Sequence, residues 1–372
     1  MELKEINSLV ELFFKKYGEK FPSISGKSHE EIFLVSLKNK DLPDTNSGPY
    51  TYSWGNIKTK IKVLSNYLKN IISKGDRCVL LSENRPEWLI SDLAIMNSGG
   101  VTVPLFTTYS ENDYEYIIKD CAPKVCIVSN LEQFKKIKNF IKENTIVISI
   151  DEFDKNIKSF EYIFFKAETD LKTLVESVVP YNDNLRRSNL ACIIYTSGTT
   201  GNPKGVMLSH GGILSNCEGA GEILNSLVKK DPPVFLTWLP LSHSYEHTVQ
   251  YVQISLGAKI YYAENLEKLL ANMAISKPTI MTAVPRFYQN LYSKIFINFS
   301  KQKGFKRQLI ENTILLGTKI LNKKTLNFKE KIINFLCEKL VRKKIKKQFG
   351  GRLKAFVSGG GALDRKLGAL LN

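Results

Sequence analysis

Two hydrophobic patterns alternate along the chain from Tyr50 onward. In some segments apolar residues recur every three or four positions, as in helices that bury one face, and in others they form short continuous runs, as in buried strands. Strands separated by helices predict an α/β fold, with mostly parallel sheets flanked by helices. The expected helices are 57–72, 86–97, 110–119 and 131–143, and the expected strands are 77–81, 101–105, 125–128, 146–150 and 190–195.

The remaining segments indicate how the chain is divided. Residues 1–48 are expected to be an N-terminal arm that contains one helix and then a polar stretch rich in turn-forming residues. Residues 151–185 are less regular, so we expect them to connect two α/β lobes. The lobes are expected to span residues 49–185 and 186–372.

Composition narrows the class of protein. With 372 residues, 43% of them hydrophobic, and a mean hydropathy of −0.16, the chain has the composition of a globular protein with a sizeable core. No run of about 18 apolar residues predicts a membrane-spanning helix, and the glutamates near the N-terminus argue against a signal peptide. The six cysteines are scattered and form no CxxC pair. We therefore expect free thiols, a cytoplasmic location and no protein-bound metal.

The net charge of +17 is concentrated near the C-terminal end of the chain. Residues 301–347 are strongly basic and are expected to be mostly helical, with Gly304 and Gly317 as candidate breaks. The densest run is 342–347, RKKIKK, which is typical of a solvated helix face, with peripheral contact to an anionic membrane as the alternative. Because the run lacks interleaved aromatic residues, no nucleic-acid partner is expected. The oligomeric state is left open.

One loop carries most of the chemical information. Residues 195–210 read YTSGTTGNPKGVMLSH and follow the apolar strand LACIIY. The glycines allow positive φ and close approach of the backbone to an anion, while hydroxyl and backbone N–H groups donate hydrogen bonds. Lys204 adds a positive charge. We expect a helix to begin at Ser209, whose N-terminus would add a favourable dipole. The segment therefore predicts a polyphosphate-binding loop.

Two other interpretations of this loop are weaker. In a Walker A loop Lys follows a glycine and precedes Ser or Thr, whereas here Lys204 precedes Gly205. An ordinary Gly/Ser linker would not need Pro203 and Lys204 between glycines, nor would it lie between a buried strand and a helix.

The complete loop resembles the phosphate-binding signature of the adenylate-forming enzymes, which include acyl-CoA synthetases, luciferases and peptide-synthetase adenylation domains. The resemblance implies a partial AMP-binding domain at 49–372, with the N-terminal large domain of the acetyl-CoA synthetase-like fold. It also implies that the loop holds ATP during attack by a carboxylate, with Mg²⁺ as helper and coenzyme A as co-substrate. The implied catalytic residues are Thr196 and Lys204. The implied nucleotide-binding residues are Thr196, Ser197, Gly198, Thr199, Thr200, Gly201, Lys204, Gly359, Gly360 and Gly361.

Further segments resemble the long-chain acyl-CoA synthetases, which implies a fatty acid substrate. The WLPLSHSYEH segment implies an acyl pocket that includes Trp238, His243 and Glu246. The SGGGAL segment lies where the family contacts adenine, although the family's usual SGGAPL differs at Gly361 and Ala362. The segments are SENRPEW (82–88), GGVTVPL (99–105), WLPLSHSYEH (238–247), KPT to VPRFY (277–288) and SGGGAL (358–363).

A competing motif overlaps one of these segments. His243 to His247 reads HSYEH, which fits the H-x-x-E-H pattern of one class of zinc peptidase. Two histidines four positions apart on a helix can bind zinc, but no third ligand is evident. We therefore expect no metal there and a packing or surface role for His247.

Relatives of this type continue beyond the SGGG segment. They carry a YGxTE-type segment with a metal-binding Glu, a ribose-binding Asp, a hinge and a small domain with a catalytic Lys, and none of these can be placed here. We therefore expect impaired thioester formation and no ATP–pyrophosphate exchange with palmitate above background. Two alternatives remain: a ligase for a short or aromatic carboxylate, and a non-catalytic nucleotide- or acyl-binding remnant.

Overall fold

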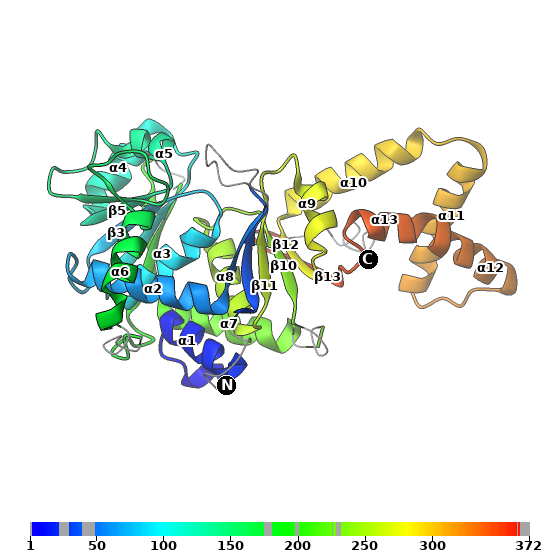
Figure 1. Cartoon of the computed structure of the whole chain (residues 1–372). Helices are drawn as coiled ribbons and strands as arrows, with labels where there is room; N and C mark the ends of the chain where they lie inside the picture. Colours follow the sequence, from blue (N-terminus) through cyan, green and yellow to red (C-terminus); the bar gives the residue numbers. More distant parts are fainter. Residues whose placement is uncertain are drawn as a thin grey trace. The chain divides into compact units, whose positions relative to one another are not determined.

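The chain divides into two compact units. One consists of Met1–Pro232 with Trp238–Tyr262, and the other of Pro233–Thr237 with Ala263–Asn372. The computed structural model describes residues 2–21, 30–38, 49–174, 181–197, 201–224, 226–227, 232–362 and 364. Both units contain parallel strands together with helices (Figure 1), so the predicted α/β fold is confirmed.

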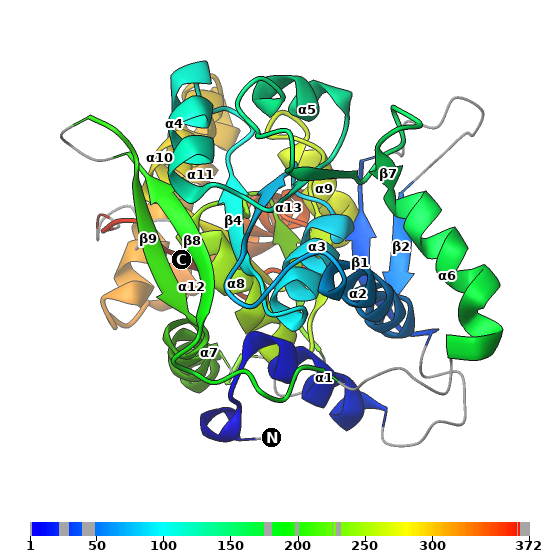
Figure 2. The same ribbon diagram turned by 90° about the vertical axis from the view of Figure 1, so that its left-hand side faces the viewer.

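The first unit is built on a seven-stranded sheet. Neighbouring strands are parallel except β8 and β9, which form an antiparallel hairpin at one edge (Figure 2). The apolar runs that the sequence predicted to be strands occupy the centre of this sheet. From edge to edge the order is β7 (Lys158–Ser159), β6 (Ile146–Ser149), β5 (Val125–Val128), β3 (Arg77–Leu81), β4 (Val101–Leu105), β8 (Leu190–Thr196) and β9 (Lys204–Ser209).

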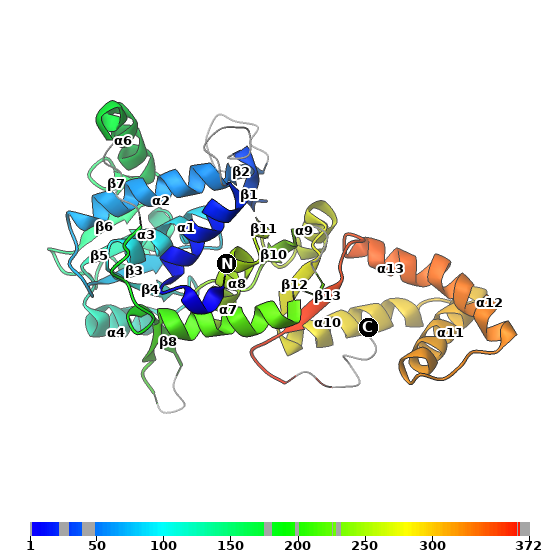
Figure 3. The same ribbon diagram turned by 90° about the horizontal axis from the view of Figure 1, so that it is seen from below.

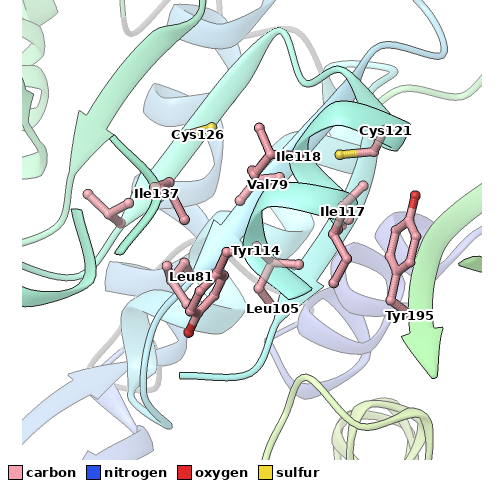
Figure 4. Packing of buried hydrophobic residues seen from close by; sticks show 12 residues of the cluster. Val79, Leu81, Leu105, Tyr114, Ile117, Ile118, Cys121, Cys126, Ile137 and Tyr195 are labelled. Atoms are coloured by element: carbon pink, nitrogen blue, oxygen red, sulfur yellow. The ribbon is translucent and has the colours of Figure 1, made fainter. Parts of the chain in front are cut away.

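Helix α4 (Glu111–Cys121) covers part of this sheet with one apolar face. A capping box between Ser110 and Asp113 starts the helix. Its buried residues are spaced three or four apart and pack on strand residues such as Leu81. Figure 4 shows this cluster, with Tyr195 of β8 at its border. Helix α5 (Leu131–Ile137) follows and is shorter than expected.

Helix α3 (Pro86–Asn97) is buried on every side. It contacts β3 and β4 of the large sheet and also β1 (Ile32–Ser36), which belongs to a second, smaller group of strands. In that group β1 pairs with β2 (Tyr50–Ser53) and with β11 (Lys259–Tyr262). Helix α3 therefore lies between two sheets, which explains why all 12 of its residues are buried.

The N-terminal segment contributes to the core of the first unit. Helix α1 (Leu9–Lys20) presents Phe13 to Trp54, with ring centroids 5.6 Å apart, and Phe33 of β1 stacks on Trp54 at 3.7 Å. Trp54 is the first residue of α2 (Trp54–Lys69). The expected arm is therefore a helix and a strand packed into the fold, and its polar stretch at 41–48 lies outside the described residues.

The second unit has three parallel strands and a long helical segment. Strands β10 (Val234–Thr237), β12 (Ile280–Ala283) and β13 (Ala355–Ser358) are neighbours in that order. Figure 3 shows α11 and α12 side by side, with α13 continuing beyond them. The helices are α9 (Leu269–Ser276), α10 (Pro285–Ser300), α11 (Gly304–Leu321), α12 (Phe328–Cys337), the π-helical turn η3 (Glu338–Arg342) and α13 (Lys343–Gln348).

The region 151–185, which was expected to connect two lobes, contains a helix, α6 (Phe160–Leu174), whose first turn buries Phe160 and Ile163. The expected break at Gly317 is wrong. Gly317 does not break α11, because a single glycine destabilises a helix interior by only about 1 kcal/mol. The guanidinium group of Arg342 lies beside this glycine and donates to the carbonyl oxygen of Thr313.

Candidate functional site

The predicted phosphate loop connects the two strands of the β8–β9 hairpin. Thr196 and Lys204 are directly opposite each other as the last pair of the ladder, so their side chains lie on the same face of the sheet. Both residues are exposed, as is Ser197. The structure thus brings together the two residues that were predicted to be catalytic. Gly198, Thr199 and Thr200 lie outside the described residues.

The strand that leads into the loop is fixed from both sides at Tyr195. The hydroxyl group of Tyr109 donates to the Tyr195 carbonyl oxygen at 2.8 Å, and the Tyr195 hydroxyl donates to Asp120 at 2.5 Å. The Tyr195 side chain is 2% exposed. Thr196 therefore starts from a rigid backbone position.

The two described glycines of the hairpin have different roles. Gly201 has a φ of 121°, a conformation that glycine adopts without strain, as the sequence predicted. Gly205 does not have a positive φ. It lies opposite Tyr195, and a Cβ atom there would be 2.9 Å from Ile193 and 3.1 Å from the Tyr195 ring. Gly205 is therefore required by close packing, which corrects the expectation of a positive φ.

The predicted helix dipole does not reach the loop. Helix α7 (His210–Leu224) begins near the expected residue, but β9 separates it from the loop. A strand of six residues spans roughly 16–20 Å at about 3.3 Å per residue. The helix-terminus effect falls off within one turn, so an anion at the hairpin would be bound by the donors of the hairpin itself and by Lys204.

Residues from other predicted segments lie at the carboxyl edge of the large sheet, where the hairpin also lies. Asn84 follows β3, Phe106 follows β4, and Thr196 ends β8, and these three strands are parallel. His243 lies at the same edge, with its ring centroid 6.2 Å from that of Phe106. Ligands of open α/β sheets bind at this edge, which makes it the candidate site of the first unit.

Asn84 holds the WLPL segment by its backbone. Its side-chain amide donates to the carbonyl oxygen of Leu239 at 2.7 Å, and the backbone N–H of Leu241 donates to its Oδ1 at 3.0 Å. The SENRPEW and WLPLSHSYEH segments, more than 150 residues apart, are thus joined by a two-point contact. Spacing along the sequence gives no indication of this contact.

Replacing Asn84 by alanine is expected to lower the free energy of unfolding by about 2 kcal/mol, because Leu239 and Leu241 lose their hydrogen-bond partners. Asn84→Asp is the matched variant. It keeps the acceptor for Leu241 but sets a carboxylate against the Leu239 carbonyl. Denaturant unfolding measures both changes. An Asn84→Ala protein as stable as the wild type would show that the contact does not hold the two segments together.

The three predicted pocket residues differ in exposure. His243 is exposed and forms the N-cap of α8 (Ser244–Ser255), where its Nδ1 accepts from the backbone N–H of Tyr245 at 3.2 Å. Trp238 is half-buried, and Glu246 is buried in the first turn of α8. An acceptor role at Nδ1 requires the neutral tautomer with its proton on Nε2.

His247 contacts a buried carboxylate. Its Nε2 lies 2.8 Å from Oδ2 of Asp92 on α3, and the hydroxyl of Tyr251 donates to the same oxygen at 2.5 Å. Burial alone lowers the pKa of His247, but the Asp92 carboxylate outweighs it and raises the pKa above its usual value. Burial alone would raise the pKa of Asp92, but the charge of His247 outweighs it and lowers that pKa. Within the described ranges no group of three or more His, Cys, Asp or Glu side chains has the arrangement of a metal site.

His210 is a second buried histidine that the sequence did not single out. It is the first residue of α7, and its Nδ1 accepts from the backbone N–H of Leu9 at 3.3 Å. Burial lowers the pKa of His210 to about 4. It is therefore neutral at physiological pH and links α7 to the start of α1.

The SGGG segment belongs to the second unit. It leaves the carboxyl end of β13, and the N–H of Gly359 donates to the carbonyl oxygen of Ala283 at the end of β12. Gly360 has a φ of 74°. The segment therefore lies at the carboxyl edge of its own parallel strands, the edge at which nucleotides bind in such sheets.

The fold and the hairpin define the class of protein. The fold is similar to that of ATP-bound MatB from Rhodopseudomonas palustris, with a TM-score of 0.62, 20% identity, and coverage of 97% of this chain and 56% of that one. It is also similar to VinN in complex with L-aspartate, with a TM-score of 0.61, 14% identity, and coverage of 98% and 73%. The chain thus has the α/β architecture of these enzymes.

The family model named AMP-binding enzyme matches residues 30–371, and the chain belongs to that family. It is 30% identical to fatty acyl-CoA synthetase A of Dictyostelium discoideum over 309 residues, which are 81% of this chain and 44% of that protein. It is 27% identical to long chain acyl-CoA synthetase 3 of Arabidopsis thaliana, over 90% of this chain and 52% of that protein. The chain spans about half the length of these curated relatives.

Proposed function

We propose that this chain is the ATP-binding part of a ligase that activates a long-chain fatty acid. In the proposed reaction a carboxylate oxygen of the fatty acid attacks the α-phosphorus of ATP, and the bond to pyrophosphate breaks. Coenzyme A then attacks the acyl carbon through its thiol, and AMP leaves. The observation that carries the proposal is the hairpin that places Thr196 opposite Lys204 at the carboxyl edge of a parallel sheet.

The proposed roles follow from the chemistry of each side chain. The Thr196 and Ser197 hydroxyl groups and the loop N–H groups would donate to phosphate oxygens, and the Lys204 ammonium would offset the charge that develops on the departing pyrophosphate. We propose that the fatty acyl chain contacts Trp238, His243 and Glu246. We propose that the adenine ring contacts Gly359, Gly360 and Gly361. The similarity to proteins named long chain acyl-CoA synthetases supports a fatty acid as the carboxylate.

The loop fits an anion and does not by itself fit a metal ion. Its described donors are hydroxyl groups, N–H groups and an ammonium, and Mg²⁺ prefers oxygen ligands such as carboxylates and phosphates. We propose that Mg²⁺ binds together with the phosphates of ATP, where it would neutralise part of their charge.

Replacing Lys204 by alanine is expected to weaken ATP binding by about tenfold or more, because one charge-assisted contact to a phosphate is lost. AMP, which lacks the β- and γ-phosphates, should lose much less affinity. Calorimetric titration of the 372-residue chain with ATP and with AMP measures both effects. Lys204→Arg should retain most of the affinity, and Lys69→Ala, at an exposed lysine on α2, serves as the control.

Two results would contradict the proposal. Equal ATP affinity for the wild type and Lys204→Ala would show that the loop is not part of the nucleotide site. An equal loss of affinity for ATP and AMP would show that Lys204 does not contact the β- and γ-phosphates. Binding of palmitoyl-adenylate and benzoyl-adenylate analogues then tests which class of carboxylic acid the site accepts, because an aromatic-acid ligase would prefer the benzoyl analogue. Robust ATP–pyrophosphate exchange with palmitate would contradict the expectation that this chain is impaired in adenylation.

We further propose that the protein works in the cytoplasm in peripheral contact with an anionic membrane. Among the described helices, none is both long and apolar enough to cross a bilayer. The proposed contact is supported by the basic net charge and by the nature of the substrate, since long-chain fatty acids partition into membranes.

A further inference from the structure

Helix α12 has an apolar stripe on its outer face. Four large hydrophobic residues are exposed at positions i, i+4, i+7 and i+8, which share one side of a helix. They are Phe328, Ile332, Phe335 and Leu336, with exposures of 78%, 50%, 57% and 38%. Phe328 is more exposed than any other large hydrophobic residue in the part of the chain that the structure describes.

The opposite face of α12 determines which way this stripe points. Cys337 is fully buried in a cluster with Leu309 of α11 and Val341 of η3, and its thiol donates to the carbonyl oxygen of Leu309 at 3.5 Å. A capping box between Asn327 and Glu330 fixes the start of the helix. The stripe therefore faces away from α11 because of packing on the other side of the same helix.

Lysines border the stripe. At 100° per residue Lys329 lies on one side of it and Lys331 on the other, and both are exposed. The ammonium group of Lys339 lies 4.7 Å from the centroid of the Phe335 ring. An apolar stripe with flanking lysines is the pattern of helices that lie in the interface of a bilayer.

The surrounding charge favours a lipid surface over a second copy of the chain. Residues 301–347 contain fifteen lysines and arginines and three glutamates, so they carry +12 of the net charge of +17. Each of the three glutamates is in an ion pair, with Arg307, Lys319 and Arg342 respectively. Two such faces would repel each other, whereas anionic headgroups attract them.

We propose that the outer face of α12, with Lys329, Lys331 and Lys339, docks onto an anionic lipid bilayer. Phe328 and Phe335 enter the boundary between headgroups and acyl chains, and the lysines contact the headgroup phosphates. The assignment rests on the proposed membrane location but needs no catalysis. Residues 342–347 are the candidate membrane contact expected from the sequence, and their lysines are exposed. We place the contact on α12 instead, because this helix has an apolar face as well as lysines.

Vesicle co-sedimentation of the 372-residue chain, without ATP or fatty acid, tests the docking surface. We expect binding to vesicles that contain about one-third phosphatidylglycerol and little binding to pure phosphatidylcholine. Phe328→Asp combined with Phe335→Asp should weaken binding at least about thirtyfold, and Lys329→Gln combined with Lys331→Gln about tenfold. Ile223→Asp, at a 72%-exposed residue of α7, is the matched control and should bind as the wild type does.

Tryptophan fluorescence tests directly whether α12 enters the bilayer. The emission of Phe335→Trp should shift to the blue and be quenched by brominated lipid, whereas that of Ile223→Trp should not. Circular dichroism and unfolding confirm that each variant is folded. Absence of vesicle binding, or binding that the α12 variants leave unchanged, would overturn the proposal. A concentration-dependent blue shift of Phe335→Trp without lipid would overturn it in favour of self-association. ATP binding is measured separately, so failure here leaves the proposed function intact.

Discussion

Replacing Asp92 by alanine is expected to lower the free energy of unfolding by about 3–5 kcal/mol. Asp92 is fully buried, and its Oδ2 contacts both Nε2 of His247 and the hydroxyl of Tyr251. Without the carboxylate, His247 is buried with no negative charge beside it. Either His247 then loses its proton or the protein unfolds. Burial opposes the charged form of His247, and Asp92 is the group that raises its pKa against that effect.

Double-mutant analysis identifies the cause of this loss. Asp92→Ala combined with His247→Ala should be less destabilising than the sum of the two single changes, because the second change removes the charge left unpaired by the first. Asp183→Ala, at an exposed aspartate, should change the stability by less than about 0.5 kcal/mol. Additive effects of the two buried changes would contradict a coupled pair.

The same network connects stability to the candidate site. Asp92 belongs to α3, which begins within the SENRPEW segment, and His247 belongs to α8, whose N-cap is His243. The Trp88 and His247 rings also pack edge to face, with centroids 5.1 Å apart. Loss of Asp92 is therefore expected to loosen the position of His243 as well as the core.

The regular elements were predictable because their apolar patterns are local. β3, β4 and α3 have the bounds expected from the sequence. The strand β9 was missed, because KGVMLS lies at the sheet edge and its apolar residues Val206 and Met207 are exposed, so no burial pattern marks it. The register that sets Thr196 opposite Lys204 depends on that strand.

The buried polar contacts were not predictable in detail, because they join distant segments. One signal was present in the sequence: Asp92 is a charged residue within the apolar run WLISDLAIM, and a buried carboxylate requires partners. Its partners at 247 and 251 are found only once α3 and α8 are folded together. Asn84 and His210 similarly act through backbone groups, which leave no trace in the residue types of their partners.

The neutral state of His210 predicts an acid-sensitive fold. Burial lowers its pKa to about 4 from an ordinary value of 6.5. As the pH falls below 6.5, the unfolded chain takes up a proton at this residue while the folded chain does not, so stability decreases until the folded pKa is reached. The His247 pair acts in the opposite sense. Because its folded pKa is raised, its contribution is complete below the unfolded pKa and is lost as the pH rises through the folded pKa.

His210→Asn isolates this effect, since an asparagine oxygen can accept from the N–H of Leu9 but does not titrate. Relative to that variant, the wild type is expected to lose about 2.5 kcal/mol between neutral pH and about pH 4.5. Denaturant unfolding of both proteins across this range measures the difference. Buried carboxylates with lowered pKa values, such as Glu87, also lose stability in acid, but they are common to both proteins and cancel. Parallel pH profiles would mean that His210 is protonated in the fold, and the contact between α7 and α1 would then have to rely on other groups.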